Sequence, residues 1–317
     1  MRLDDFLHGK KTIGIAGHIH PDGDCVGSNL GVYNYIRTVD PSIDVSVYLE
    51  PIPNIFKFLK GADQIQTADP HSERVFDLFI VLDCGDTGRL GDAAVYFEHA
   101  KETLCIDHHL SNSSFADHNH IVPDASSTCE LVFDLTDPDN IDCAIAECLY
   151  TGIIHDTGLF QYDCTSRHTM EAAGVLMEKG IDFSKIVDQT FNAKTFEQNR
   201  IMGRALLDAR RYQNNRVIAS VVTAEEMKEY SVLPKHLDGI VSQLRETKDV
   251  FAALFLYEQG NGVYKVSARA SCDINLVTIA ARYGGGGHAK AVGFTIQGDP
   301  WEAAERLAGE IAVLLDE

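Results

Sequence analysis

The stretch Thr12-Ile13-Gly14-Ile15-Ala16-Gly17-His18-Ile19-His20-Pro21-Asp22-Gly23-Asp24 decides the fold of this chain. Its first six residues form a short apolar run, which predicts a buried strand. The strand ends at a turn that carries two histidines and two aspartates, and the residues from Gly27 to Ile36 then predict a helix. A buried strand, a polar turn and a helix in this order are typical of α/β proteins, which bind ligands beyond the strand ends.

Two further clusters of polar residues follow predicted strands in the same way. The apolar run from Val75 to Leu82 ends at Asp83-Cys84-Gly85-Asp86, and the run from Glu102 to Ile106 ends at Asp107-His108-His109. The alternating residues from Val45 to Leu49 predict another strand. Because the carboxyl ends of parallel strands lie at one edge of a sheet, we expect the three clusters to meet there.

The pattern changes at Arg216, where a second and smaller α/β domain begins. Its predicted strands are 217–222, 250–257 and 263–269, and its predicted helices are 223–230, 237–247, 274–283 and 301–315. Before it, Ser127 and Glu130 match a capping box, and helices are predicted over 127–135, 142–154 and 166–179. We therefore expect a first domain with a mostly parallel sheet flanked by helices over residues 1–190, a helical linker over 191–215 and the second domain over 216–317.

The composition suits a globular protein of two domains. The chain has 317 residues, of which 45% are hydrophobic. Its eight cysteines include no CxxC pair, so we expect free thiols rather than disulfides or structural zinc. No apolar run reaches the roughly 18 residues of a spanning helix, and the acidic N-terminus is no signal peptide. We expect a cytoplasmic protein with no membrane partner.

The net charge of −20 limits the partners of this chain. Long nucleic acids are bound mainly by lysines and arginines that neutralise phosphates, so a long duplex is excluded as a partner. A small phosphorylated molecule remains compatible with this charge if metal ions and a few cations create a local positive potential.

The acidic clusters predict a site for two divalent metal ions. Two carboxylates about 4 Å apart repel each other by roughly 4 kcal/mol at an effective dielectric of about 20, so four that converge require cations or protons. Carboxylates with neutral imidazoles favour Mn²⁺, with Mg²⁺ or Co²⁺ as alternatives. Taken alone, Pro-Asp-Gly-Asp is more often a plain turn and a His-His pair more often a surface feature; their conjunction favours the metal. The candidate ligands are His18, Asp22, Asp24, Asp83, His108 and Asp156.

A glycine run near the C-terminus predicts a phosphate-binding backbone. Gly284, Gly285, Gly286 and Gly287 precede His288, and glycine allows backbone N–H groups to approach an anion closely. The run is neither a P-loop nor a dinucleotide-binding fingerprint, and a bare glycine run is more often a flexible turn.

These residues resemble the DHH superfamily of phosphoesterases. The resemblance covers nearly the whole chain and is closest to its stand-alone oligoribonuclease and pAp phosphatase branch. The N-terminal motifs stand in the family's order, and the second domain resembles the DHHA1 type. The matching stretches are His18-x-x-Pro21-Asp22-x-Asp24, Asp83, Asp107-His108-His109, Gly152 to Gly158, Gly284 to His288 and Ala291-Val292-Gly293-Phe294.

The resemblance implies a role for each candidate residue. One metal would be held by His18, Asp22 and Asp83, and the other by Asp24, Asp83, His108 and Asp156, with Asp83 bridging them. The resemblance also implies that His109 faces the substrate phosphate, that Asp107 orients the histidines, and that Arg269 contacts phosphate. The expected catalytic residues are thus His109, Asp107 and Arg269; the expected substrate-binding residues are Arg269, Gly284 to His288, and His20, which stands where Arg or Asn is common.

The implied reaction is hydrolysis of short oligoribonucleotides and pAp by a hydroxide that bridges the two metals. A phosphodiesterase for cyclic or linear dinucleotides, such as c-di-AMP, pApA and pGpG, is the main alternative. A pyrophosphatase or exopolyphosphatase shares the N-terminal motifs, but the glycine run and the DHHA1-like region weigh against it. A non-catalytic nucleotide sensor ranks lowest because every metal position is filled. The branch also implies a homodimer.

Overall fold

The computed structural model describes residues 1–316, and the chain divides into two compact units. The first unit comprises Met1–Ala193, and the second begins at Lys194. The segment 191–215, expected to be a helical linker, contains helix α8 (Phe196–Leu207) and strand β7 (Arg210–Tyr212), which both lie in the second unit. The predicted fold class, two α/β domains, is confirmed.

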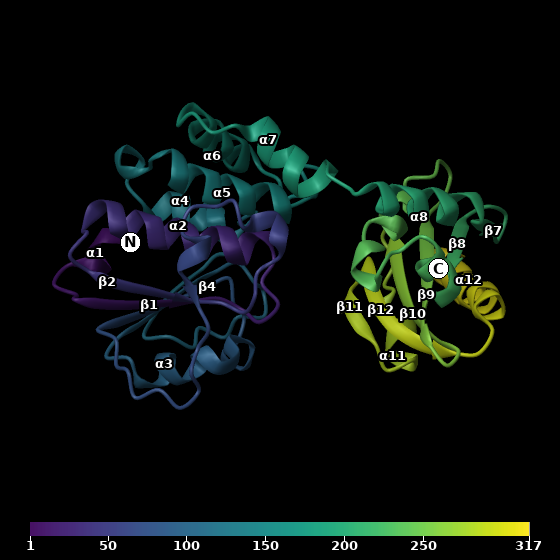
Figure 1. The fold of residues 1–317 in the computed structure, drawn as a ribbon, viewed down its shortest axis with the longest axis horizontal. Helices are drawn as coiled ribbons and strands as arrows, with labels where there is room; N and C mark the ends of the chain where they lie inside the picture. Colours follow the sequence, from purple (N-terminus) through teal and green to yellow (C-terminus); the bar gives the residue numbers. More distant parts are fainter. Residues whose placement is uncertain (317) are drawn as a thin grey trace. The chain divides into compact units, whose positions relative to one another are not determined.

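The first unit is built on a parallel sheet (Figure 1). Within the described residues this sheet has six strands in the order β3-β2-β1-β4-β5-β6. Because the chain builds outward from β1 in one direction and from β4 in the other, the loops after these two strands diverge and leave a crevice. The strands are β1 (Thr12–Ala16), β2 (Asp44–Tyr48), β3 (Ile65–Gln66), β4 (Leu78–Leu82), β5 (Thr103–Asp107) and β6 (His118–Ile121).

Helices cover both faces of this sheet, which explains why β4 is a continuous apolar run. On one face, α2 (Gly23–Val39), α4 (Thr128–Leu135) and α5 (Cys143–Asp156) form the larger core with the strands (Figure 1). On the other face, α3 (Ala94–His99) contributes Tyr96 to a smaller aromatic core. The remaining helices of the unit are α1 (Asp4–Leu7), α6 (Arg167–Glu178) and α7 (Phe183–Val187).

The second unit contains a mixed sheet. Over the described residues its six strands follow the order β11-β12-β10-β9-β8-β7, in which β8 and β9 are parallel and the other neighbours are antiparallel. Besides β7, the strands are β8 (Val217–Val222), β9 (Ala252–Gly260), β10 (Val263–Ala270), β11 (Gly286–His288) and β12 (Ala291–Gln297).

The two faces of this mixed sheet are covered differently. Helices α11 (Val277–Arg282) and α12 (Pro300–Asp316) bury one face. On the other face, α8, α9 (Ala224–Glu229) and α10 (Ile240–Arg245) pack mainly against β8 and β9. A row of half-buried polar side chains on β10 therefore remains accessible: Lys265, Ser267 and Arg269.

The sequence did not predict strands β3, β6, β7, β11 and β12. Strand β3 has two residues and β6 is the polar stretch His118–Ile121, so neither carries an apolar pattern. Strand β12 does alternate, since Val292, Phe294 and Ile296 are buried between exposed or half-buried neighbours. Among the helices that the structure describes, none combines the length and hydropathy that a membrane-spanning helix requires.

Candidate metal centre

The six predicted metal ligands converge on the crevice at the carboxyl edge of the parallel sheet. Asp83 and His108 directly follow β4 and β5, and His18 lies two residues after the end of β1. Asp22 is the N-cap of α2 and Asp24 lies in its first turn, while Asp156 is the last residue of α5. The topology thus explains why residues from distant parts of the sequence share one site.

Asp83 lies between two groups of these ligands. Its Oδ2 is 3.4 Å from Nε2 of His18, and its Oδ1 is 3.7 Å from Nε2 of His108. The backbone of Asp83 has a φ of 54°, an uncommon conformation for a residue other than glycine. Local strain of this kind is concentrated at functional sites, because the surrounding structure must hold it in place.

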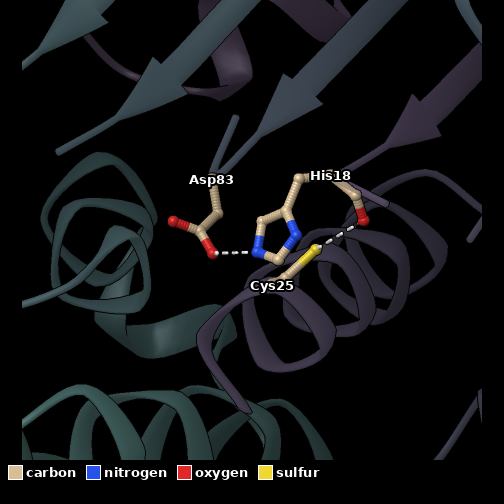
Figure 2. Close-up of side chains that lie close together, drawn as sticks. All are labelled: His18, Cys25 and Asp83. Carbon is tan, nitrogen blue, oxygen red and sulfur yellow. Dashed lines mark hydrogen bonds and ion pairs between the residues drawn. The ribbon is translucent and has the colours of Figure 1, made fainter. Parts of the chain in front are cut away.

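The first group surrounds His18. Its Nε2 lies 3.8 Å from Oδ2 of Asp22, and its Nδ1 lies 2.7 Å from the carbonyl oxygen of Ile19. Figure 2 shows that the buried thiol of Cys25, on α2, also lies beside His18 and Asp83. One ligand atom from each of these three residues lies within 4.8 Å of the others.

The second group surrounds His108. Its Nε2 lies 3.1 Å from Oδ2 of Asp156 and 3.9 Å from Oδ2 of Asp24. Its Nδ1 lies 3.3 Å from the carbonyl oxygen of Ala125. In both groups a backbone carbonyl engages Nδ1 and Nε2 faces carboxylates, which is the arrangement of a metal-ligating histidine.

Asp24 is held by the N-terminus of helix α4. Its Oδ2 accepts the N–H of Thr128 at 2.6 Å, and its Oδ1 accepts the N–H of Cys129 at 2.9 Å. The hydroxyl of Thr128 also donates to Oδ1 of Asp83 at 3.2 Å. A helix N-terminus stabilises a nearby anion, so α4 fixes one carboxylate of the site and contacts a second.

The charges in the crevice are strongly coupled. Burial raises the pKa of Asp24, and the charges of Asp83 and Asp156 raise it further. Burial would lower the pKa of His18, but Asp22 and Asp83 outweigh it and raise the value to about 10.

The second histidine behaves in the same way. Burial opposes protonation of His108, yet Asp156, Asp24 and Asp83 raise its pKa to about 10. In the absence of cations, the negative charge of these carboxylates therefore keeps His18 and His108 protonated. The donors are mainly carboxylate oxygens and imidazole nitrogens, which fits divalent ions of the Mn²⁺ and Mg²⁺ type.

Asp107 and His109 form a hydrogen-bonded pair beside this centre. Nδ1 of His109 lies 2.7 Å from Oδ1 of the fully buried Asp107, and this contact raises the pKa of His109. The resemblance implied that Asp107 orients both histidines; in the structure Asp107 contacts His109, whereas Ala125 provides the contact to His108.

Asn112 completes this pair and was not predicted. Its Nδ2 donates to Oδ2 of Asp107 at 2.7 Å and to the carbonyl oxygen of Cys84 at 3.2 Å. The same atom lies 3.5 Å from Sγ of Cys105. Asn112 therefore joins the loop after β5 to the end of β4. Asparagine is common in loops, so the sequence alone does not indicate this role of Asn112.

His20, an expected substrate-binding residue, lies at the rim of the crevice and is 87% exposed. Its backbone has a φ of 58°. Its N–H donates to Oε2 of Glu50 at 2.8 Å, and its Nδ1 lies 3.1 Å from the same oxygen. Glu50 thus holds His20 in an uncommon backbone conformation.

The other expected substrate-binding residues lie in the second unit. Arg269 on β10 pairs with Ala291 on β12, which pairs with His288 on β11, so Arg269 and His288 share one row of the sheet. Beside Arg269 is a hollow of about 400 Å³, lined in part by Lys235, Tyr257, Ser267 and Arg269. Lys235 and Arg269 supply two cationic groups to this hollow, and Asp238 supplies one carboxylate.

The first part of the glycine run ends a helix. Gly284 has a φ of 68°, and its N–H donates to the carbonyl oxygen of Ala281 at 3.2 Å. The N–H of Gly285 donates to the carbonyl oxygen of Ala280 at 2.9 Å. These two bonds form a Schellman motif at the end of α11, in which glycine is favoured.

The rest of the run pairs closely with β12. A Cβ on Gly285 would lie 2.3 Å from the carbonyl oxygen of Gly293, and one on Gly287 would lie 2.2 Å from that of Ala291. A Cβ on Gly286 would meet no atom within 4 Å. Folding therefore explains the glycines at 284, 285 and 287, and Gly286 is the member of the run that folding does not require.

Two family models match the chain. The model described as "DHH family, N-terminal domain" matches residues 12–153, which include five of the six candidate ligands. The model described as "DHHA1 domain" matches residues 214–315, which include Arg269 and the glycine run.

Related proteins match the chain across both of these domains. A bifunctional oligoribonuclease and PAP phosphatase NrnA from Thermus thermophilus is 27% identical over 92% of this chain and 87% of its own length. Its counterpart from Bacillus subtilis is 23% identical over 96% and 95%. The crystal structure of an exopolyphosphatase-related protein from Bacteroides fragilis matches 99% of this chain and 96% of its own, with a TM-score of 0.88 and 27% identity. The chain therefore carries a DHH-family N-terminal domain followed by a DHHA1 domain, and is a hydrolase that acts on phosphate esters.

Proposed function

We propose that this protein hydrolyses short oligoribonucleotides and pAp at a centre of two divalent metal ions. The position of Asp83 carries the proposal, since its two oxygens face His18 on one side and His108 on the other. The similarity to the NrnA proteins supports the class of substrate.

The proposed metal positions follow the two groups of ligands. His18, Asp22 and Asp83 would hold one ion, and Asp24, Asp83, His108 and Asp156 the other; Mn²⁺ is the proposed ion. When bound, such ions activate water and neutralise the charge of a phosphate. The protein contributes a fixed set of oxygen and nitrogen donors, because α4 holds Asp24 and backbone carbonyls engage His18 and His108.

His109 is the proposed contact to the non-bridging oxygens of the phosphate. Because its Nδ1 is bound to Asp107, its Nε2 is left to donate a hydrogen bond. Asp107 favours the charged form of His109, so the imidazolium can stabilise negative charge that develops on the phosphate.

Substrate length is proposed to depend on the acidic character of the chain. A net charge of −20 repels a long polyanion, whereas a mononucleotide or short oligonucleotide needs only a few cationic contacts. Arg269 would supply a bidentate contact to one phosphate, and the N–H groups around Gly286 and His288 would approach another.

An assay with four substrates tests this proposal. We expect Mn²⁺-dependent release of product from pAp and from short RNA, with weaker turnover of c-di-AMP and pGpG. Asp83→Asn should reduce turnover by at least about 100-fold, because loss of a residue that merely supports a ligand already costs 10–100-fold. Asp63→Asn, at an exposed position, is the matched control.

The outcome also separates the competing activities. Turnover of c-di-AMP or pGpG without turnover of pAp would favour the dinucleotide phosphodiesterase instead. Binding of all four substrates without any turnover in Mn²⁺ would leave the non-catalytic nucleotide sensor as the remaining hypothesis. Full activity in Asp83→Asn would refute the assignment of the metal ligands.

A further inference from the structure

A second cavity lies beside the metal centre in the first unit. It has a volume of about 290 Å³ and is lined by the loops that follow β1, β2 and β3 and by the turn at residues 90–93. His18 belongs both to this cavity and to the metal centre. Ligand sites in open α/β sheets occupy this edge, and the volume is at the lower end of small-molecule pockets.

The cavity has an apolar floor and an acidic rim. Tyr48, Leu49 and Leu90 are buried and form part of the floor. Glu50 and Asp92 are exposed and supply carboxylates at the rim. Among the described residues that line the cavity there is no lysine or arginine. A phosphate would be repelled here, whereas a flat group with N–H donors would be favoured.

Glu50 is fixed in position and still has a free acceptor. The N–H and Nδ1 of His20 both lie at Oε2 of Glu50, at 2.8 and 3.1 Å. Within the described part of the chain, Oε1 has no hydrogen-bond partner. The uncommon backbone conformation of His20, with φ of 58°, keeps this pair at the mouth of the cavity.

We propose that this cavity binds the nucleobase next to the scissile phosphate and that Glu50 and Asp92 favour guanine over uracil. This inference rests on the proposed function, because the phosphate of the same nucleotide would lie at the metal centre. Guanine presents N1–H and an amino group on one edge, so a carboxylate can accept both. Uracil presents a single N–H between two carbonyl oxygens, which the carboxylates would repel. A site that hydrogen-bonds one base rejects an analogue that leaves its polar groups unpaired.

Equilibrium binding to the metal-free protein tests the base preference without turnover. The probes are guanosine, 5′-GMP and 5′-UMP, titrated calorimetrically into the full chain in EDTA. We expect 5′-GMP to bind at least about tenfold more tightly than 5′-UMP, and guanosine to compete with it. Glu50→Gln should weaken 5′-GMP binding about tenfold, a change of about 1.4 kcal/mol, and should not weaken 5′-UMP binding. Asp92→Asn should act in the same direction.

The matched control is Glu178→Gln, at an exposed carboxylate on α6. Equal binding of 5′-GMP and 5′-UMP to the unmodified protein would overturn the inference. An equal loss of affinity for both nucleotides in Glu50→Gln would also overturn it. So would a failure of guanosine to compete with 5′-GMP for binding. A guanine preference in EDTA together with no hydrolysis in Mn²⁺ would instead uphold the cavity and refute the proposed function.

Discussion

The backbone nitrogen of Thr128 lies 2.6 Å from Oδ2 of Asp24, although the two residues are 104 positions apart in the sequence. This contact, with its neighbour from Cys129, makes Asp24 part of the fold as well as a candidate ligand. Asp22, by comparison, has a side chain that is 61% exposed and accepts the N–H of Cys25. The two aspartates of one motif therefore have different structural roles.

Asparagine substitutions at these two positions should separate the roles. In Asp24→Asn, an amide N–H₂ faces a backbone N–H, so one buried donor loses its acceptor. We expect the free energy of unfolding in EDTA to fall by about 1–3 kcal/mol, measured by urea denaturation. Asp22→Asn should change it by a few tenths of a kcal/mol, because asparagine is an equally good N-cap. Equal losses in the two variants would contradict this interpretation of α4.

Asn112→Ala should reduce turnover more than it reduces stability. The substitution removes the contact to Oδ2 of Asp107, so His109 loses its fixed orientation. We expect kcat to fall about 10–100-fold with little change in KM, as is usual for residues that support a ligand shell. Asn119→Ala is the control, since within the described residues the side chain of Asn119 bonds only to the backbone of Ala116. A comparable fall in kcat for Asn119→Ala would indicate a general loss of loop structure.

Alanine substitutions can divide the glycine run into folding and binding positions. Gly285→Ala places a Cβ against the carbonyl of Gly293, so we expect a loss of about 1–3 kcal/mol in the free energy of unfolding. Gly286→Ala meets open space, and stability should stay within about 0.5 kcal/mol. If the backbone at Gly286 approaches phosphate, the KM for pAp should rise about tenfold in Gly286→Ala. An unchanged KM would remove this glycine from the proposed phosphate site.

The affinity for Mn²⁺ should rise with pH. In the metal-free protein the pKa values of His18 and His108 are both about 10, so at neutral pH these rings carry protons that a metal must displace. The displacement becomes easier as the pH rises toward 10. Each released proton should give about a tenfold gain in affinity per pH unit, so calorimetry at about pH 7 and about pH 8 should differ by about 10–100-fold. An affinity independent of pH would contradict the assignment of these imidazoles as ligands.

His155 should make the protein less stable as the pH falls. Burial lowers its pKa to about 4, and its ring stacks on Phe191 at 4.3 Å and meets the edge of Phe56 at 4.9 Å. Because the unfolded state binds the proton more readily, the contribution of neutral His155 is complete above about pH 6.5 and is lost as the pH falls toward 4. The difference amounts to roughly 3 kcal/mol. His155→Phe should have a flatter profile of unfolding free energy over this range.

Local sequence patterns predicted the elements around the metal centre well. Strand β4 is a continuous apolar run because both of its faces are buried, and such a run can be recognised without a structure. The predicted helix start at Ser127 is also observed, since its hydroxyl accepts the N–H of Glu130. The reciprocal half of the capping box is absent from the described residues, because the carboxylate of Glu130 accepts from Ser126 instead.

Contacts between distant segments could not be predicted in this way. The role of Asn112 depends on the spacing of β4 and β5, and the bonds from α4 to Asp24 depend on packing across more than 100 residues. The glycine run shows a different limit. Four consecutive glycines are compatible with a helix end, a tight strand pairing and a phosphate-binding backbone. In the structure, Gly284, Gly285 and Gly287 serve the helix end or the strand pairing.

The contact of α4 with Asp24 also bears on what would happen if the proposed ions were removed. Main-chain donors keep this carboxylate in place by themselves, so a chelated sample should retain its native shape rather than collapse. Such a protein could be stored empty and reconstituted simply by adding salt of the chosen ion. In a cell, its activity would then follow the supply of free metal from moment to moment, without a cycle of unfolding and refolding.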